Sequence, residues 1–240
     1  MATIYTCPTS FNIAAARITL ADPCLGVQKA GATNGFITDA LESGSAEPQV
    51  RDGVKIQKAS GNSALGLSVD IRRPETLIGR TVKVKMQKSD IYLASLFVPG
   101  SFVTKTVSAN ELVIGWIEMA GALTNKVFIE IWEENEFGNC SVDVALYGAT
   151  RHVFGIGSPK APSMAFANGD NRSQDLEFDC QPWRPSTGWT GPAGDFPVDV
   201  VTDNNTLLAA NPTKKLNYMG FYEASIPVAQ CGLLAVTAAP

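Results

Sequence analysis

His152 has the clearest capacity for chemistry, because it is the only histidine among the 240 residues of the chain. Nucleophilic catalysis by a Ser-His-Asp or Cys-His arrangement would have to be built on this side chain. It lies in the segment 150–153 (TRHV), where we expect a strand end, and no Gly-x-Ser-x-Gly motif is present. We therefore predict no catalytic residues, and an enzyme is the least supported of the functions considered.

The densest charge in the chain is an acidic cluster formed by Glu130, Glu133, Glu134 and Glu136. Two carboxylates at a suitable separation could hydrolyse a glycosidic bond. Glu130 lies in a segment that we expect to be a strand, whereas the next three glutamates are expected in the turn that follows. A solvated hairpin end is therefore the favoured interpretation of this cluster.

The sequence gives no support for a metal or cofactor site, and we predict neither. A single histidine excludes a multi-histidine metal site, and the five cysteines show no CxxC spacing. A calcium site made of carboxylates alone stays open, although no acidic loop has the spacing of an EF-hand. No GxxxxGK[ST] motif is present for phosphate binding. We expect free thiols, with Cys7–Cys24 as the one disulfide considered.

Two tryptophans lie in the stretch 181–197, which is rich in glycine and proline. Proline removes backbone donors and glycine permits turns, so this stretch cannot form a continuous central strand. The rings could stack on sugars, cover the chain's own core or pack on a neighbouring subunit. We predict packing between subunits for four residues: Trp183, Trp189, Pro192 and Phe196. A Trp189→Ala change should then impair assembly more than solubility.

The elements that would position these residues are mostly strands. Apolar and polar residues alternate with period two, most clearly in 81–86 (TVKVKM), where Val82, Val84 and Met86 should face inward. Clusters of Gly, Pro and Asn separate such segments, which indicates a β-sandwich or barrel. Further strands are expected at 15–20, 54–57, 67–70, 111–119, 127–132, 142–148, 175–179 and 197–202.

One segment has helical periodicity. Ser89 or Asp90 can cap a short helix within 89–98, which Pro99 and Gly100 would end. A second short helix at 205–210 has weaker support. The predicted fold class is therefore mainly β, a sandwich or barrel with one short flanking helix.

The charge balance limits the choice of partners. The chain has a net charge of −4 and no basic run, so it lacks the electrostatic footprint for gripping nucleic acid or anionic lipid. No apolar stretch approaches the roughly 20 residues of a membrane span. The N-terminal sequence shows no secretory signal, so we expect folding in the cytoplasm.

Several segments follow one another in a recognisable order. They are 16–20 (ARITL), 52–56 (DGVKI), 82–92 (VKVKMQKSDIY), 115–116 (GW), 128–132 (FIEIW), 142–149 (VDVALYGA) and 188–192 (GWTGP). Over about residues 12–200, this order resembles that of the major tail tube proteins of long-tailed, non-contractile bacteriophages. Residues 201–240 match nothing in that pattern.

The resemblance implies a β-sandwich or barrel domain of the tail tube type over residues 1–200. Residues 201–240 would be an extension packed on the same domain or on a neighbouring subunit. Such subunits assemble into hexameric rings, and the rings stack around a tape-measure protein into a tube that conducts the genome into the host. The long loops expected at 40–52 and 155–174 are candidates for contacts with the next ring.

The resemblance also implies the partners and the location. Its partners are other copies of the chain, the tape-measure protein and the tail terminator and distal tail proteins. Genomic DNA would pass without specific binding, since an acidic lumen repels phosphate. The implied location is the tail of the virion, after synthesis in the cytoplasm of the host bacterium, with no membrane insertion.

Two other functions stay open at the level of the sequence. A carbohydrate- or receptor-binding β-sandwich of a virion would bind a glycan through its tryptophans and would not polymerise. A capsid or decoration protein with a jelly-roll-like body would form caps or trimers rather than tubes.

Overall fold

The computed structural model describes residues 8–53, 55–59, 68–72, 74–87, 90–108, 110–137, 148–165, 173–226 and 232–237. The elements in these ranges are strands with two short helices. They are β1 (Pro8–Asp22), β2 (Val27–Gln28), β3 (Gly31–Thr38), β4 (Leu41–Arg51), β5 (Lys55–Ala59), β6 (Ser68–Arg72), β7 (Thr76–Met86), α1 (Ile91–Phe97), β8 (Gly100–Val107), β9 (Asn110–Glu118), β10 (Lys126–Phe137), β11 (Ala149–Pro159), β12 (Ser163–Ala165), β13 (Ser173–Cys180), α2 (Val198–Ala210), β14 (Met219–Glu223) and β15 (Gly232–Val236).

One antiparallel sheet of 11 strands forms the body. Its strands follow the order β15-β3-β1-β10-β11-β13-β7-β4, and β2, β12 and β14 pair beside this path. The sheet folds over itself, so that β4 at one end contacts β1 near the middle. Apolar side chains from both halves then meet in a first core. The prediction of a mainly β fold of the sandwich class with a short helix is confirmed.

Alternation along β7 supplies one wall of the first core. Val82, Val84 and Met86 are buried and Lys83 is exposed, as the period-two pattern predicts. Helix α1 closes one end of the core with three buried apolar side chains. The side chain of Asp90 caps this helix by accepting a hydrogen bond from the Tyr92 amide at 2.8 Å, which confirms Asp90 as a cap; Ser89 lies outside the described residues.

Strand β11 is where the sheet divides. One of its edges pairs with β10, and the other pairs with β14 at one end and with β13 at the other. Gly155 lies between these two pairings, and the ring of Trp183 occupies the space that a Cβ there would need. Glycine is therefore required at this position for the indole to pack directly on the strand.

The C-terminal part of the chain forms a layer over the outer face of β10 and β11. A second core lies beneath it, which Val200 and Val201 of α2 help to cover. Helix α2 runs across the domain boundary predicted at residue 200, and β14 and β15 pair within the main sheet. The described residues after 200 therefore pack on the same body as the residues before them.

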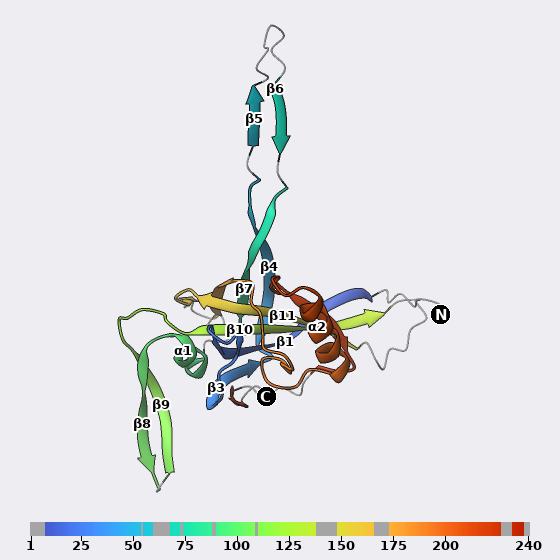
Figure 1. The fold of residues 1–240 in the computed structure, drawn as a ribbon. Coiled ribbons are helices and arrows are strands. Elements are labelled where there is room, and N and C mark those ends of the chain that lie inside the picture. Colours follow the sequence, from blue (N-terminus) through green and yellow to red (C-terminus); the bar gives the residue numbers. More distant parts are fainter. Residues whose placement is uncertain are drawn as a thin grey trace.

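Two hairpin arms project from the body (Figure 1). The first arm begins where β4 and β7 leave the body near their Arg51–Thr76 pair, beyond the pairing of β7 with β13, and it is continued by the two-stranded sheet β5–β6. The second arm is the hairpin β8–β9, which follows α1. Figure 1 shows the two arms pointing away from the body in different directions.

Several predicted elements differ from those in the structure. The segment 197–202, expected to be a strand, begins helix α2, which spans 13 residues rather than only 205–210. The loop expected at 40–52 is mostly strand β4, and the loop expected at 155–174 contains the end of β11, β12 and the start of β13. The predicted strand 142–148 lies almost wholly outside the described residues, as do 166–172.

Candidate functional site

Five charged side chains meet beneath the C-terminal layer, on the outer face of the sheet. This charge network consists of Arg17, Glu130, Arg151, Asp195 and Glu223. Arg17 and Glu130 are directly opposite each other on β1 and β10, and both face away from the first core. Asp195 comes from the loop before α2, and Glu223 comes from β14. The network therefore joins three sheet strands to the C-terminal layer.

Hydrogen bonds satisfy the charges of the network from several sides. Arg17 donates from Nε to Glu130 at 2.6 Å and from Nη1 to Asp195 at 2.9 Å. Arg151 donates from Nε to Glu130 at 2.8 Å, from Nη2 to Asp195 at 2.7 Å and from Nη1 to Glu223 at 2.9 Å. Each guanidinium therefore reaches both the sheet carboxylate and the loop carboxylate, in the fork geometry that suits arginine.

The ring of Trp132 lies against both arginines, with guanidinium carbons 5.0 and 4.9 Å from its centroid. Its indole nitrogen also donates to Glu223 Oε2 at 2.9 Å. Cation–π contacts of this kind attract each guanidinium group to the ring, and the attraction is stronger where the groups are withdrawn from water. The described contacts of the network all lie within the chain. The network therefore holds the sheet and the C-terminal layer together.

Electrostatic interactions favour the charged forms of Arg17 and Asp195, although burial disfavours them. Burial alone disfavours the charged guanidinium of Arg17, but Glu130 and Asp195 outweigh this effect and raise the pKa of Arg17. Burial would likewise raise the pKa of Asp195, but hydrogen bonds and charges from Arg17 and Arg151 lower it to about 2. The carboxylate of Asp195 thus stabilises the fold in its charged form.

This shift predicts a pH dependence of stability. Because the pKa of Asp195 falls from an ordinary 3.8 to about 2 in the folded chain, its stabilising effect is complete above about pH 4 and is lost as the pH falls through about 2. Asp195→Asn should lower the free energy of unfolding at pH 7, and the deficit relative to the wild type should shrink between pH 4 and pH 2. Urea unfolding across this range measures it; a deficit that is constant with pH would contradict the linkage.

The four residues predicted to pack between subunits are all buried within the chain itself: Trp183, Trp189, Pro192 and Phe196. Trp183 and Trp189 are only 1% and 0% exposed. Trp189 packs on Phe128 and Phe196 at centroid distances of 5.5 and 5.3 Å, and its indole nitrogen donates to Gln28 Oε1 at 2.7 Å. These side chains have no surface left for a neighbouring subunit, so the prediction is corrected: they anchor the loop to its own sheet.

The same burial removes the basis for sugar stacking by these tryptophans. A ring that binds a sugar must present a face to solvent, and neither Trp183 nor Trp189 does. The backbone of Trp183 is also paired in both directions with Leu216, at 2.9 and 2.8 Å. The stretch is therefore an ordered cover of the second core.

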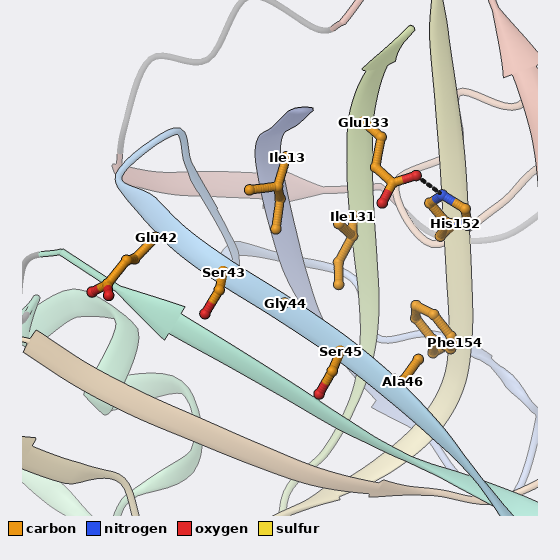
Figure 2. A pocket seen from close by; sticks show the side chains of 10 residues that line it. All are labelled: Ile13, Glu42, Ser43, Gly44, Ser45, Ala46, Ile131, Glu133, His152 and Phe154. Carbon is orange, nitrogen blue, oxygen red and sulfur yellow. Dashed lines mark hydrogen bonds and ion pairs between the residues drawn. The ribbon is translucent and has the colours of Figure 1, made fainter. Parts of the chain in front are cut away.

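His152 lies inside β11 rather than at a strand end. It borders a cavity of about 400 Å³ between the two halves of the sheet, into which Ile131 and Phe154 also point (Figure 2). Its Nε2 lies 2.9 Å from a carboxylate oxygen of Glu133, and its Nδ1 lies 2.6 Å from the hydroxyl of Tyr218. With the proton assigned to Nε2, the histidine donates to Glu133 and accepts from Tyr218.

Both ring nitrogens of His152 therefore have partners in the chain. Burial raises the pKa of Tyr218, which favours the protonated hydroxyl that this arrangement needs as a donor. In this geometry neither nitrogen is free to take a proton from a substrate. The arrangement links β10, β11 and the residue before β14, as a structural contact would.

The acidic cluster is not a hairpin end. Glu130 is fully buried in the charge network, and Glu133 and Glu134 continue β10, which extends through Phe137. The side chain of Glu136 lies outside the described part of the chain. The interpretation as a solvated turn after residue 132 is therefore wrong, because β1 pairs with β10 along this whole segment.

Thiol reactivity distinguishes two cysteines. Burial, with a smaller contribution from Asp179, raises the pKa of Cys180 to about 12, whereas Cys24 is exposed. We expect iodoacetamide at pH 8 to alkylate Cys24 in the folded protein and to reach Cys180 only after unfolding, since the thiolate is the reactive form. Peptide mass mapping measures both sites. Equal labelling of the two in the native protein would contradict the buried placement of Cys180.

The β8–β9 arm exposes large apolar side chains along most of its length. Those at least one third exposed are Phe102, Val107, Leu112, Ile114 and Ile117. Phe102 and Trp116 are cross-strand partners, and so are Ser101 and Ile117, so adjacent pairs place apolar groups on both faces. At the base, Phe102 packs on Tyr92 of α1 at 5.4 Å. A two-stranded hairpin of this kind is marginally stable unless something covers it.

A groove on the C-terminal layer is the second exposed apolar feature. It runs along α2 towards β14, and Leu207 and Leu216 line both of its parts. Leu207 is 55% exposed. The side chain of Asn204 also lines the groove; it is buried, and its Nδ2 has no hydrogen-bond partner among the described residues. Neither of these surfaces was identified from the sequence.

Two further observations limit the chemistry of the described residues. They contain no cluster of three or more His, Cys, Asp or Glu side chains placed to hold a metal ion. Neither described helix is long and apolar enough to cross a membrane. Comparison of the sequence with models of protein families and with curated proteins finds no match.

Proposed function

We propose that this chain is a structural subunit of the tail tube of a long-tailed, non-contractile bacteriophage. Copies would close into hexameric rings, and stacked rings would form the conduit for genome ejection. The observation that carries the proposal is the architecture: a β-sandwich body with two projecting hairpin arms, one of which leaves apolar side chains uncovered on both faces. Uncovered apolar surface of this extent is typical of proteins that associate.

Further features of the chain agree with this function. The main sheet ends in two strands, β15 and β4, and no other described strand pairs with their outer edges, which suits contacts between subunits. The net charge of −4 suits a conduit that DNA passes without binding. The order of segments from 16–20 to 188–192 resembles the tail tube family. The β4–β7 arm, where a loop was expected, is a candidate for contacts between rings.

The proposal assigns no catalysis, cofactor or metal to the chain. Its partners would be other copies of the chain, the tape-measure protein and the tail terminator and distal tail proteins, within the virion tail. The internal contacts of the charge network and of His152 fit a role in holding a rigid body together. Because Trp183 and Trp189 are buried, no observation favours a carbohydrate-binding module as a second candidate.

Electron microscopy of the concentrated protein tests the proposal, with light-scattering mass measured on the same sample. Rings or hollow tubes with a regular axial repeat would support it. Caps or trimers would favour a capsid or decoration protein instead. A protein that stays monomeric at every concentration and shows a saturable change of tryptophan fluorescence with a glycan would overturn it.

A further inference from the structure

We propose that the β8–β9 arm of one copy docks in the groove between α2 and β14 of a second copy of this chain. The inference rests on the proposed function and names one of the contacts that would close its rings. The arm and the groove are the two exposed apolar features described above. Figure 1 shows the β8–β9 arm and helix α2, which borders the groove, well apart on the body. An arm therefore reaches the groove of a neighbour rather than its own.

Apolar complementarity is the first argument. Leu112, Ile114 and Ile117 of the arm are each at least half exposed, and Leu207 at the groove is 55% exposed. Docking removes these side chains from water on both partners at once. It also gives the two-stranded arm the cover that it needs to be stably folded.

Hydrogen bonding at the groove is the second and independent argument. Asn204 is 5% exposed, and its Nδ2 donors have no partner among the described residues. A buried donor without a partner is costly, so the site favours a ligand that brings an acceptor. The arm is a two-stranded sheet, so each of its strands has an outer edge with unpaired carbonyl groups. Because Nδ2 is enclosed in the single chain, a strand edge along the groove supplies the missing acceptor once the Asn204 side chain turns towards it.

Charge complementarity is the third argument. The arm from 100 to 118 carries Glu111 and Glu118 against a single Lys105. Lys214 and Lys215 border one part of the groove, and Asp203 borders the other. The acidic arm and the basic end of the groove attract each other and favour one orientation of docking.

This contact uses two different surfaces of the chain, so each docked copy still offers a free arm or a free groove. Such a heterologous contact closes into a ring or continues as a filament. It thus predicts complementation between variants. Ile114→Lys damages only the arm, and Leu207→Glu damages only the groove. Each variant alone should therefore need a protein concentration at least about tenfold higher than wild type to assemble.

An equimolar mixture of the two variants should recover assembly, because a lysine on the arm meets a glutamate in the groove while the remaining surfaces are unaltered. Light-scattering mass against concentration, with electron microscopy of the same samples, measures this. Ile114→Leu and Leu207→Met are the matched controls and should assemble as wild type does. Circular dichroism and melting temperature establish that every variant is folded; both positions are exposed in the single chain.

The outcomes separate the contact from the function. Tubes that form equally well from both charged variants would overturn the docking and leave the tail tube proposal standing. Closed oligomers that are lost in each variant and restored in the mixture, without tubes, would support the docking and overturn the tube. Loss of assembly in each variant without recovery in the mixture would overturn the docking, and a wild type that never associates would overturn both.

Discussion

Glu130→Gln is expected to lower the free energy of unfolding by about 3–5 kcal/mol, as when one partner of a buried ion pair is removed. Glu130 is fully buried and accepts hydrogen bonds from both Arg17 and Arg151. A neutral amide of the same shape leaves the two guanidinium groups close together with less opposing charge, and it turns an amide donor towards them. Urea unfolding at pH 7, followed by tryptophan fluorescence, measures the change.

Glu42→Gln is the matched control for this prediction. Glu42 also pairs with a cation, Lys85 at 2.7 Å, but both side chains are more than one third exposed. Solvent screens such a pair, so the control should leave the urea midpoint unchanged within error. If Glu130→Gln lowered the free energy of unfolding no more than Glu42→Gln does, the network would not hold the two layers together as its contacts indicate.

Trp189→Ala should destabilise the fold by about 3–5 kcal/mol, the range for truncating a fully buried large aromatic residue. The indole fills the space between Phe128, Trp183 and Phe196, and its loss also removes the hydrogen bond to Gln28. The reason differs from that given by the sequence, which placed this ring between subunits. Differential scanning calorimetry and urea unfolding of the dilute protein measure the effect.

Trp189→Phe keeps a ring in the second core and should lower the free energy of unfolding clearly less than Trp189→Ala does. Ile114→Ala, at an exposed position of the arm, should change the melting temperature little. The informative contradiction is a Trp189→Ala protein that melts like the wild type but no longer assembles. That result would return this tryptophan to a role between subunits.

Strand β7 was predictable because one of its faces is buried in the first core and the other faces solvent. In β7 this difference produces the alternation from Val82 to Met86. Strand β4 was missed because it lacks this difference between a buried and an exposed face. Its sequence LESGSAEPQVR lies at the edge of the main sheet and leads into an arm, and most of its residues are exposed, so no apolar alternation marks it.

Helix α2 was mistaken for a strand at its start because VDVV combines β-branched residues with period two. Its inward face carries Val201, Asn204 and Leu208, spaced three and four residues apart. The polar Asn204 in the middle hides this helical period. Packing on the second core, which the local sequence does not reveal, decides the conformation.

The charge network could be predicted only in part. A signal exists: Arg17 and Glu130 are single charges within apolar segments, AAARITL and VFIEIW, where an unpaired charge would be too costly to bury. Their partner Asp195 is 178 residues from Arg17 and lies in a loop without periodicity. Only the register of β1 on β10 and the path of the C-terminal layer bring these groups together. The docking surfaces likewise depend on how the arm and α2 leave the body.

The pairing of β1 with β10 governs how the chain reaches this structure. The first described strand finds its longest partner only after residues 126–137 have been made, and Arg17 meets Asp195 later still. At a synthesis rate of roughly 10 residues per second, β1 waits on the order of 10 s on the ribosome with its apolar face and edge open. Contacts so distant in sequence also make closure slow. We therefore expect the yield of folded protein to respond to growth temperature and chaperone supply more than to mutations on the surface.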